Sequence, residues 1–225
     1  MTLPKITQPI FEFDVPSLGE KRRFRAFTVR EEKILLIAKQ ADEQEHIMLS
    51  LTQIINNCSI DDDIDATRLP YFDIEYLFIK LRIVSIGGTI DFKVNDNDAK
   101  IDLDDVVIQG EVRSGDITIK LDETTAVYMK YPTVKDLATI DGTPESLVTA
   151  STRCISRVFH NDNLYNFDDY SDDDKQTFVE DMSSSQFGKF REFFSTLPAV
   201  TVNAKYKDKQ GKLHDYEVRG LRNFL

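Results

Sequence analysis

Cysteines, histidines and long apolar runs are scarce in this chain of 225 residues, and each scarcity excludes a class of protein. Two cysteines, Cys58 and Cys154, cannot build a disulfide framework, and they fit a reducing compartment. No apolar run approaches the roughly 18 residues that a membrane helix needs, so no membrane span is expected. Residues 1–10 lack the apolar core of a signal peptide, so export is not expected.

Motifs that bind cofactors or transition metals are also missing. None of the three histidines, His46, His160 and His214, has the spacing of a zinc site. His160 follows an apolar helical pattern, so we expect it at the C-terminal end of a helix, where the helix dipole favours it. Gly87 and Gly88 stand without the lysine of a phosphate-binding loop and without the spacing of a dinucleotide-binding loop. We therefore expect no cofactor, no metal and no catalytic residue.

Acidic clusters are the remaining candidates for chemistry. The spacing of Asp61, Asp63 and Asp65 suggests a calcium loop, but that loop requires glycine at its sixth position and glutamate at its twelfth. Those positions hold Ala66 and Phe72, so a solvated loop with weak cation binding at most is expected. Pairs of carboxylates could also serve a hydrolase, which stays open as an alternative, although a chain with 39 acids contains such pairs by chance.

The charge distribution divides the chain. Acids outnumber bases by 39 to 28, which gives a net charge of −11 and disfavours a general nucleic-acid-binding protein. Residues 60–125 hold sixteen acids and seven bases, whereas residues 186–225 hold eight bases and four acids. One interpretation is a solvated acidic surface. The other is a subunit with segregated charge that docks on unlike neighbours.

Local signals in the first 90 residues predict a hairpin followed by helices. Alternation predicts an antiparallel hairpin over residues 10–29. Thr28 and Glu31 have capping-box spacing, so a helix should begin near Val29. Its expected apolar face consists of Ile34, Ile37, Ala38 and Ala41. A second helix should run to about Asn57. A third should be capped by Asp73 and end at Gly87 and Gly88.

The rest of the chain alternates between the two kinds of pattern. Alternating apolar residues predict a small sheet over about 89–131. Helical spacing resumes after Thr143 and Pro144, with an inner stripe of Leu147, Ala150, Ser151, Cys154, Ile155 and Val158. Two further helices begin near Ser171 and around Phe187, and a C-terminal hairpin follows Pro198. The prediction is an α+β fold with an N-terminal β-hairpin, a helical core, an inserted small antiparallel sheet and a C-terminal β-hairpin. We expect a single domain over 1–225 with the inserted β subdomain at about 89–131.

Three segments together resemble one known family. They are residues 24–39 (FRAFTVREEKILLIAK), 69–82 (LPYFDIEYLFIKLR) and 129–133 (MKYPT). These segments are similar to the baseplate hub proteins of T-even-like contractile-tailed bacteriophages, and the resemblance runs from about residue 20 to the end.

The resemblance implies a structural protein of the virion tail baseplate without enzymatic activity, made in the host bacterial cytoplasm. Its partners would be other baseplate hub or tail proteins, with no nucleic acid and no small-molecule substrate. The family includes hub subunits and a factor that promotes hub assembly without remaining in the virion, so both roles stay open. Similar proteins often carry Cys-x-x-Cys knuckles in the inserted sheet and the terminal hairpin. This sequence has none there, so the terminal hairpin would be a degenerate zinc ribbon without metal.

The interaction residues that we expect are basic or apolar. A basic strand contains Arg22, Arg23 and Arg25, and a basic terminal hairpin contains Lys205, Lys207, Lys209 and Lys212. The C-terminal tail adds Leu221, Phe224 and Leu225, which we expect to anchor on this domain or on a neighbouring subunit. The alternative for each basic residue is plain solvation, since exposed lysine and arginine are common.

Overall fold

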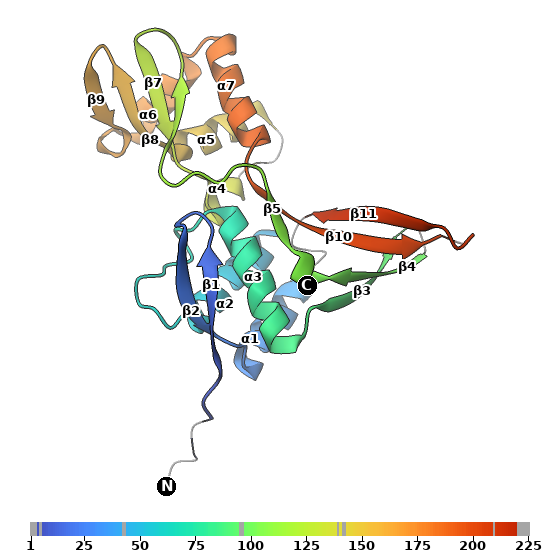
Figure 1. The fold of residues 1–225 in the computed structure, drawn as a ribbon. Coiled ribbons are helices and arrows are strands. Elements are labelled where there is room, and N and C mark those ends of the chain that lie inside the picture. Colours follow the sequence, from blue (N-terminus) through green and yellow to red (C-terminus); the bar gives the residue numbers. More distant parts are fainter. Residues whose placement is uncertain are drawn as a thin grey trace. The chain divides into compact units, whose positions relative to one another are not determined.

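A computed structural model describes residues 4, 6–41, 44–94, 97–138, 140, 143–208 and 210–219. The described chain forms an α+β fold with small antiparallel sheets, as predicted (Figure 1). It divides into two compact units. The first contains Met1–Gln109 together with Ala199–Leu225, and the second contains Gly110–Pro198. The expectation of a single domain over 1–225 stays a prediction, since two compact units can fold together or separately.

The first unit opens with the predicted hairpin. Strands β1 (Ile10–Val15) and β2 (Glu20–Arg25) are antiparallel, with Ile10 opposite Arg25 and Val15 opposite Glu20. The rings of Phe13 and Phe24 stack across the two strands with centroids 5.7 Å apart. Burial of these rings on one face of the hairpin sets the side that packs on the helices.

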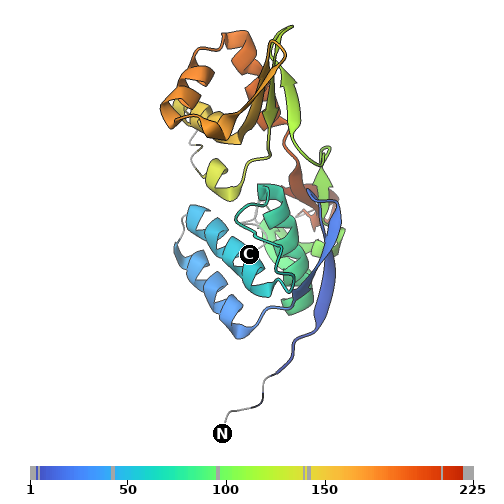
Figure 2. The same ribbon diagram turned by 90° about the vertical axis from the view of Figure 1, so that its left-hand side faces the viewer.

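Three helices follow the hairpin: α1 (Val29–Ala41), α2 (Gln44–Cys58) and α3 (Tyr71–Ile86). Helix α2 packs against both of the others, so it lies between them (Figure 2). Helix α3 is buried on several sides because it also packs against β1 and β10. Its buried apolar residues are Phe72, Ile74, Leu77, Phe78, Ile79 and Leu81.

Two details of the helix predictions are wrong. On α1 the buried apolar residues are Leu35 and Ala38, whereas Ile37 is 66% exposed. Helical spacing is compatible with either Leu35 or Ile37 on the buried face of α1. Packing against α2 buries Leu35 and leaves Ile37 exposed. Asp73 does not cap α3, because Pro70 occupies the N-cap and Asp73 is fully buried in the first turn. The predicted end of α3 is confirmed at Gly87, whose φ of 103° suits glycine.

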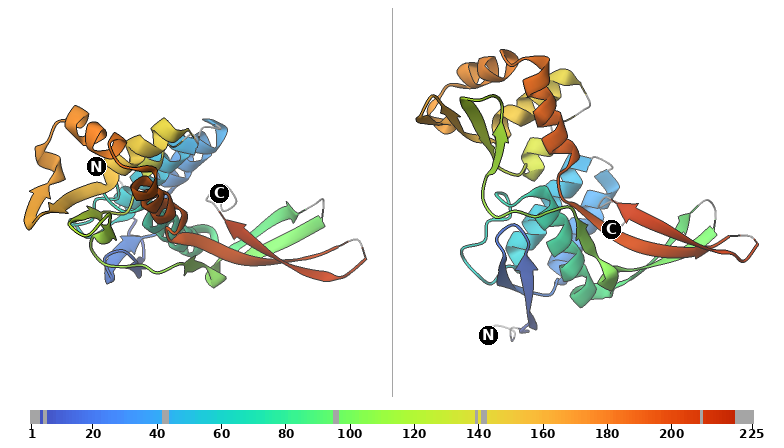
Figure 3. Two further views of the ribbon diagram at one scale, coloured as in Figure 1. Left: turned by 90° about the horizontal axis from the view of Figure 1, so that it is seen from above. Right: turned by 45° about the horizontal axis from the view of Figure 1, so that its top comes forward.

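The sheet of the first unit joins segments that are far apart in sequence. Strands β3 (Thr89–Val94) and β4 (Asn97–Asp102) form a hairpin, and β10 (Ala199–Lys207) with β11 (Leu213–Arg219) forms the predicted C-terminal hairpin. The strand order is β11-β10-β4-β3 (Figure 3). The short strand β5 (Val107–Gln109) pairs with the first residues of β10. The strands predicted over 89–131 are therefore present, but they belong to two sheets.

The second sheet has the order β6-β7-β8-β9 and lies in the second unit. Its strands are β6 (Ile117–Lys120), β7 (Thr125–Met129), β8 (Ile155–His160) and β9 (Asn163–Asn166). The accompanying helices are α4 (Val134–Leu137), α5 (Pro144–Cys154), α6 (Asp172–Glu180) and α7 (Ser184–Ser195). A buried core joins sheet and helices through Val127, Met129, Cys154, Val179 and Phe190.

The prediction of a helix through Val158 is wrong. Helix α5 ends at Cys154, and the chain continues directly into β8, so Val158 and His160 are strand residues. Asn161 and Asp162 then form a tight turn with φ of 47° and 63°, and β9 returns beside β8. Asparagine and aspartate tolerate this left-handed backbone, which suits a two-residue hairpin turn.

Candidate interaction surfaces

Two arginines of β2 bind the acidic loop after α2. The guanidinium of Arg23 lies 2.9 Å (Nε) and 2.6 Å (Nη2) from Asp61 Oδ1, and its backbone N–H donates to Asp61 Oδ2 at 2.7 Å. Arg22 Nη2 lies 3.1 Å from Asp63 and Arg22 Nη1 lies 2.7 Å from Glu20. Hydrogen bonds from Arg23 lower the pKa of Asp61. The acidic loop therefore has its counter-charge within the protein.

The third arginine of β2 holds a buried carboxylate. Arg25 forms a bidentate pair with Glu31, with both N–O distances 3.0 Å, and also donates to the carbonyl of Asn57 at 2.7 Å. The backbone N–H of Thr28 donates to Glu31 at 2.9 Å, which is one of the two hydrogen bonds of a capping box, and α1 begins at Val29 as predicted. Burial opposes ionisation of Glu31, but the hydrogen bonds from Arg25 and Thr28 outweigh it and lower its pKa to about 2.

The predicted basic strand thus has internal roles in the structure. Arg22, Arg23 and Arg25 each contact a carboxylate of the same chain, and together they tie the hairpin to the loop after α2 and to α1. A partner that uses these guanidinium groups would have to share them with Asp61, Asp63 and Glu31. Their role in assembly stays a prediction. Sequence spacing alone did not indicate these pairs, since Arg23 and Asp61 are 38 residues apart.

The lysines of the terminal hairpin are solvent-exposed where they are described. Lys205 and Lys207 lie on β10 and Lys212 lies just before β11, whereas Lys209 is outside the described residues. The backbone pairs Lys205 with Asp215 on β11 and with Lys100 on β4. The tail residues Leu221, Phe224 and Leu225 also lie outside the described residues, so their anchoring stays a prediction.

A carboxylate organises the terminal turn where the resemblance implied a zinc knuckle in related proteins. Asp208 Oδ1 accepts hydrogen bonds from the backbone N–H groups of Gln210 and Lys212, both at 2.9 Å. Its other oxygen lies 2.8 Å from His214 Nε2, and the hydrogen bond to His214 lowers the pKa of Asp208. Among the described residues no three His, Cys, Asp or Glu side chains are grouped to hold a metal ion.

The cysteines and His160 have structural surroundings. Cys58 is fully buried, and burial raises the pKa of its thiol to about 12. Cys154 is equally buried, and burial raises its pKa further. Such thiols are poor nucleophiles, because the thiolate is the reactive form. His160 at the end of β8 contacts Thr125 Oγ1 through Nδ1 at 2.9 Å, so the prediction that it ends a helix is wrong.

Two pockets open within the second unit. One, of about 580 Å³, is bordered by Arg113, Lys120, Tyr131, Lys189 and Glu192. Lys189 Nζ donates to the carbonyl of Leu121 at 3.1 Å, so this lysine is engaged by the protein. The other, of about 480 Å³, is called the aromatic pocket below. It is lined by Val158, His160, Tyr165, Phe167, Tyr170, Asp174, Lys175 and Phe178.

Exposed apolar side chains gather on α1 of the first unit. Val29, Leu36 and Ile37 are 73%, 55% and 66% exposed. The positions of Val29 and Leu36, seven residues apart, fall on one side of the helix. The sequence pattern predicted that Ile37 lies in the core, so this exposed apolar surface became apparent only from the structure. No described helix has the length and apolarity that crossing a bilayer requires.

Comparison with models of protein families gives a match over most of the chain. A family model described as T4 bacteriophage base plate protein matches residues 8–225. No curated protein and no solved structure matches the chain. The matched region contains every strand and helix described above. The chain therefore belongs to the T4 bacteriophage base plate protein family.

Proposed function

We propose that this chain is a structural subunit of the hub of a contractile phage-tail baseplate, with no enzymatic activity. The observation that carries the proposal is the family match over residues 8–225. It places the chain among baseplate proteins, and the role in the hub is the finer inference. The protein would be made in the host bacterial cytoplasm and would bind other hub or tail proteins in the virion.

The surface of α1 supports a role in assembly. Val29, Leu36 and Ile37 expose apolar side chains from one helix, although Leu35 and Ala38 already bury its inner side against the core. Contiguous exposed apolar surface is typical of sites that bind another protein. Arg30 and Lys33 lie on the same helix, so a neighbour with an apolar centre and acidic margin would fit it.

The chemistry of the described residues also favours a structural role. Asp73 is a buried carboxylate with a raised pKa, but the hydrogen-bond partner seen for it is Ser17 of the hairpin turn, which gives it a structural function. Glu31 has the opposite shift and is paired with Arg25. A hydrolase that uses two carboxylates needs an acid and a base facing one substrate. These two buried carboxylates instead hold separate parts of the scaffold.

Quantitative mass spectrometry of phage particles tests the proposal. Purified virions, isolated baseplates and infected-cell lysate would be compared with a labelled standard of this chain. A hub subunit should appear in virions at a fixed ratio to the other baseplate proteins. Presence in assembly intermediates but absence from washed virions would contradict the proposal and favour an assembly factor. A known soluble phage enzyme serves as the control for carry-over.

A further inference from the structure

The aromatic pocket of the second unit has a preformed apolar floor. Phe167 is buried, and its ring packs edge-on against Phe178 with centroids 5.7 Å apart. Val158 of β8 lies opposite Tyr165 of β9, which fixes the position of the wall that this tyrosine forms. The floor therefore exists without a ligand, and the pocket volume of about 480 Å³ can receive a large apolar side chain.

Two tyrosines form exposed parts of the pocket wall. Tyr165 and Tyr170 are 39% and 44% exposed, and the neighbouring Leu164 is also exposed. Tyrosine supplies a large rigid surface at little cost in conformational entropy, and it is enriched among the residues that dominate binding energy at interfaces. Its ring face also attracts lysine and arginine. The wall thus favours an apolar group with a cation beside it.

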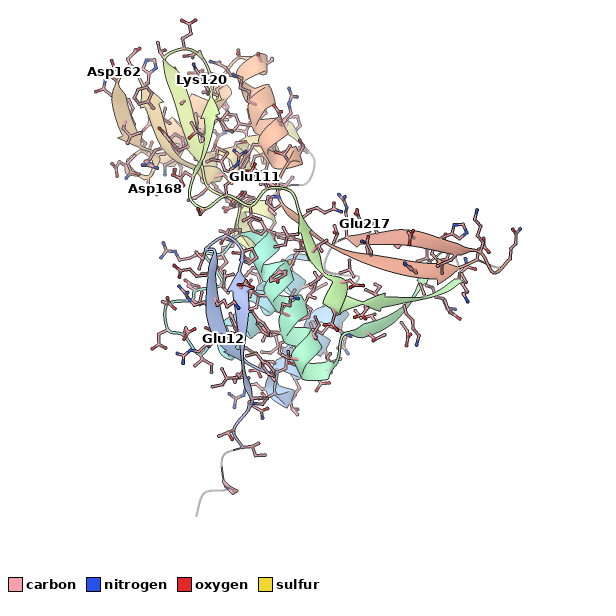
Figure 4. All side chains as sticks on the ribbon, in the orientation of Figure 1. Glu12, Glu111, Lys120, Asp162, Asp168 and Glu217 are labelled. Carbon is pink, nitrogen blue, oxygen red and sulfur yellow. The ribbon has the colours of Figure 1, made fainter. Side chains whose placement is uncertain are left out.

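The surroundings of the pocket are strongly acidic. The segment between the β8–β9 turn and the first turn of α6 contains one base, Lys175, which lies 3.7 Å from Asp172. Asp162 precedes β9 and Asp168 follows it, as the labelled side chains in Figure 4 show. The exposed acids of this segment are Asp162, Asp168, Asp169, Asp172, Asp173 and Asp174. Their combined field attracts a cationic partner.

We infer that the aromatic pocket receives an apolar side chain from a lysine- or arginine-rich segment of another baseplate protein. Charge complementarity selects this occupant over a second copy, because two chains of net charge −11 repel each other. The inference names a partner class for this pocket and rests on the proposed function only for the statement that the partner is a baseplate protein.

Fluorescence anisotropy with the full chain tests the pocket directly. The probe is a labelled peptide with an adjacent leucine and phenylalanine between two pairs of lysines. One comparison peptide has glutamates in place of the lysines, and another has serines in place of the apolar pair. We expect the first peptide to bind at least about tenfold more tightly than either comparison peptide and to weaken as salt increases.

Two sets of variants locate the binding site. Tyr165→Ser with Tyr170→Ser should weaken the basic apolar peptide about tenfold or more, and unchanged thermal unfolding confirms that the exposed substitutions leave the fold intact. Asp168→Asn with Asp173→Asn should weaken binding and reduce its salt dependence. Asp62→Asn with Asp105→Asn removes the same charge in the first unit and should leave the affinity unchanged.

Several results would overturn the inference. If the serine-containing peptide bound as tightly as the basic apolar peptide, the apolar pair would not contribute, and the binding would be a nonspecific attraction of cations to the acidic surface. Failure of the basic apolar peptide to bind, or binding that is insensitive to the tyrosine variants, would exclude the pocket as its site. Self-association in sedimentation that the tyrosine variants abolish would make a second copy the occupant. None of these results changes whether the chain is present in virions, which tests the proposed function separately.

Discussion

The buried carboxylate of Asp73 on α3 accepts two hydrogen bonds from Ser17, which lies 56 residues earlier in the turn between β1 and β2. The backbone N–H of Ser17 donates to Oδ1 at 3.1 Å, and its hydroxyl donates to Oδ2. Burial raises the pKa of Asp73 to about 6, even though the hydrogen bonds from Ser17 favour the ionised form. The turn between β1 and β2 is thus held on α3 by a carboxylate that titrates in mildly acidic solution.

From the raised pKa of Asp73 we predict how the stability of Asp73→Asn relative to wild type changes with pH. The folded pKa of about 6 exceeds the ordinary aspartate value of 3.8. The stability that protonation of Asp73 contributes is therefore fully present below 3.8 and is lost as the pH rises through 6. A shift of about two pKa units corresponds to roughly 3 kcal/mol. The stability of Asp73→Asn relative to wild type should therefore rise by about that amount between pH 4 and pH 7.

Urea denaturation of both proteins at several pH values measures this difference. Asp105→Asn, at an exposed position of the same unit, is the matched control and should follow the wild-type curve. Parallel curves for wild type and Asp73→Asn from pH 4 to pH 7 would show that Asp73 does not titrate in this range.

Glu31→Gln should destabilise the protein at neutral pH. The substitution removes the negative charge that pairs with both nitrogens of Arg25, and loss of a buried ionic partner typically costs about 3 kcal/mol. The pKa of Glu31 is lowered to about 2 from 4.5, so the stability that its charge provides is present above 4.5 and is lost as the pH falls through 2. The deficit of the variant should therefore be largest at pH 7 and clearly smaller at pH 3, which lies between the two pKa values.

Chemical denaturation at pH 7 and pH 3 measures that deficit. Glu32→Gln changes the adjacent exposed carboxylate and should have an effect below about 0.5 kcal/mol. If Glu31→Gln and Glu32→Gln were equally stable at pH 7, the pair between Arg25 and Glu31 would not contribute to the fold.

Ser151→Ala should stabilise the second unit. The hydroxyl of Ser151 is fully buried and has no hydrogen-bond partner among the described residues. A buried polar group without a partner typically costs about 1 kcal/mol or more, and alanine removes it with little loss of volume. Alanine also has the higher helix propensity. We expect a gain of about 1 kcal/mol in the free energy of unfolding.

Ser146→Ala on the same helix is the contrasting variant. Ser146 is also buried, but its hydroxyl donates to the carbonyl of Thr143 at 2.8 Å at the start of α5. Its substitution should lower the free energy of unfolding by about 1 kcal/mol. A loss of stability in Ser151→Ala would indicate that its hydroxyl has an unseen partner such as water.

Asp208→Ala should loosen the terminal hairpin without unfolding the protein. The substitution removes the acceptor for the N–H groups of Gln210 and Lys212 and the contact with His214. Hydrogen exchange followed by mass spectrometry should show faster exchange in peptides from 199–219 and unchanged exchange in 144–195. Asp215→Ala, at an exposed position of β11, is the control. Unchanged exchange in Asp208→Ala would mean that the backbone alone maintains the turn.

The parts of the fold that follow local rules could be predicted from the sequence. Thr28 with Glu31 marked the start of α1, and Thr143 with Pro144 marked the start of α5. The confirmed hairpins pair strands that are adjacent in the chain, and the alternation of apolar residues defines each strand. These signals involve only a few neighbouring residues, so they can be recognised in the sequence without knowledge of the tertiary structure.

The misread segments depend on contacts that are distant or ambiguous in sequence. Val158 is four residues from Cys154, which fits helical spacing, yet the alternation of a strand was also available and the turn at Asn161 and Asp162 favoured it. The pairs of Ser17 with Asp73 and of Arg23 with Asp61 join residues 56 and 38 positions apart. The sequence therefore could not show which carboxylates pair with the arginines of β2, whose role in assembly stays a prediction.

The position of β10 has a consequence for the order in which the protein can be built. Strands β4 and β5 are synthesised before the second unit, but both pair with β10, which begins only at Ala199. At typical rates of about 5–20 residues per second, several seconds separate these strands from their partner on the ribosome. During that interval their edges are open to pairing with other chains. Completion of the sheet of the first unit is therefore a late event of translation. In chains truncated before Ala199, β4 can still pair with β3, but its other edge lacks β10.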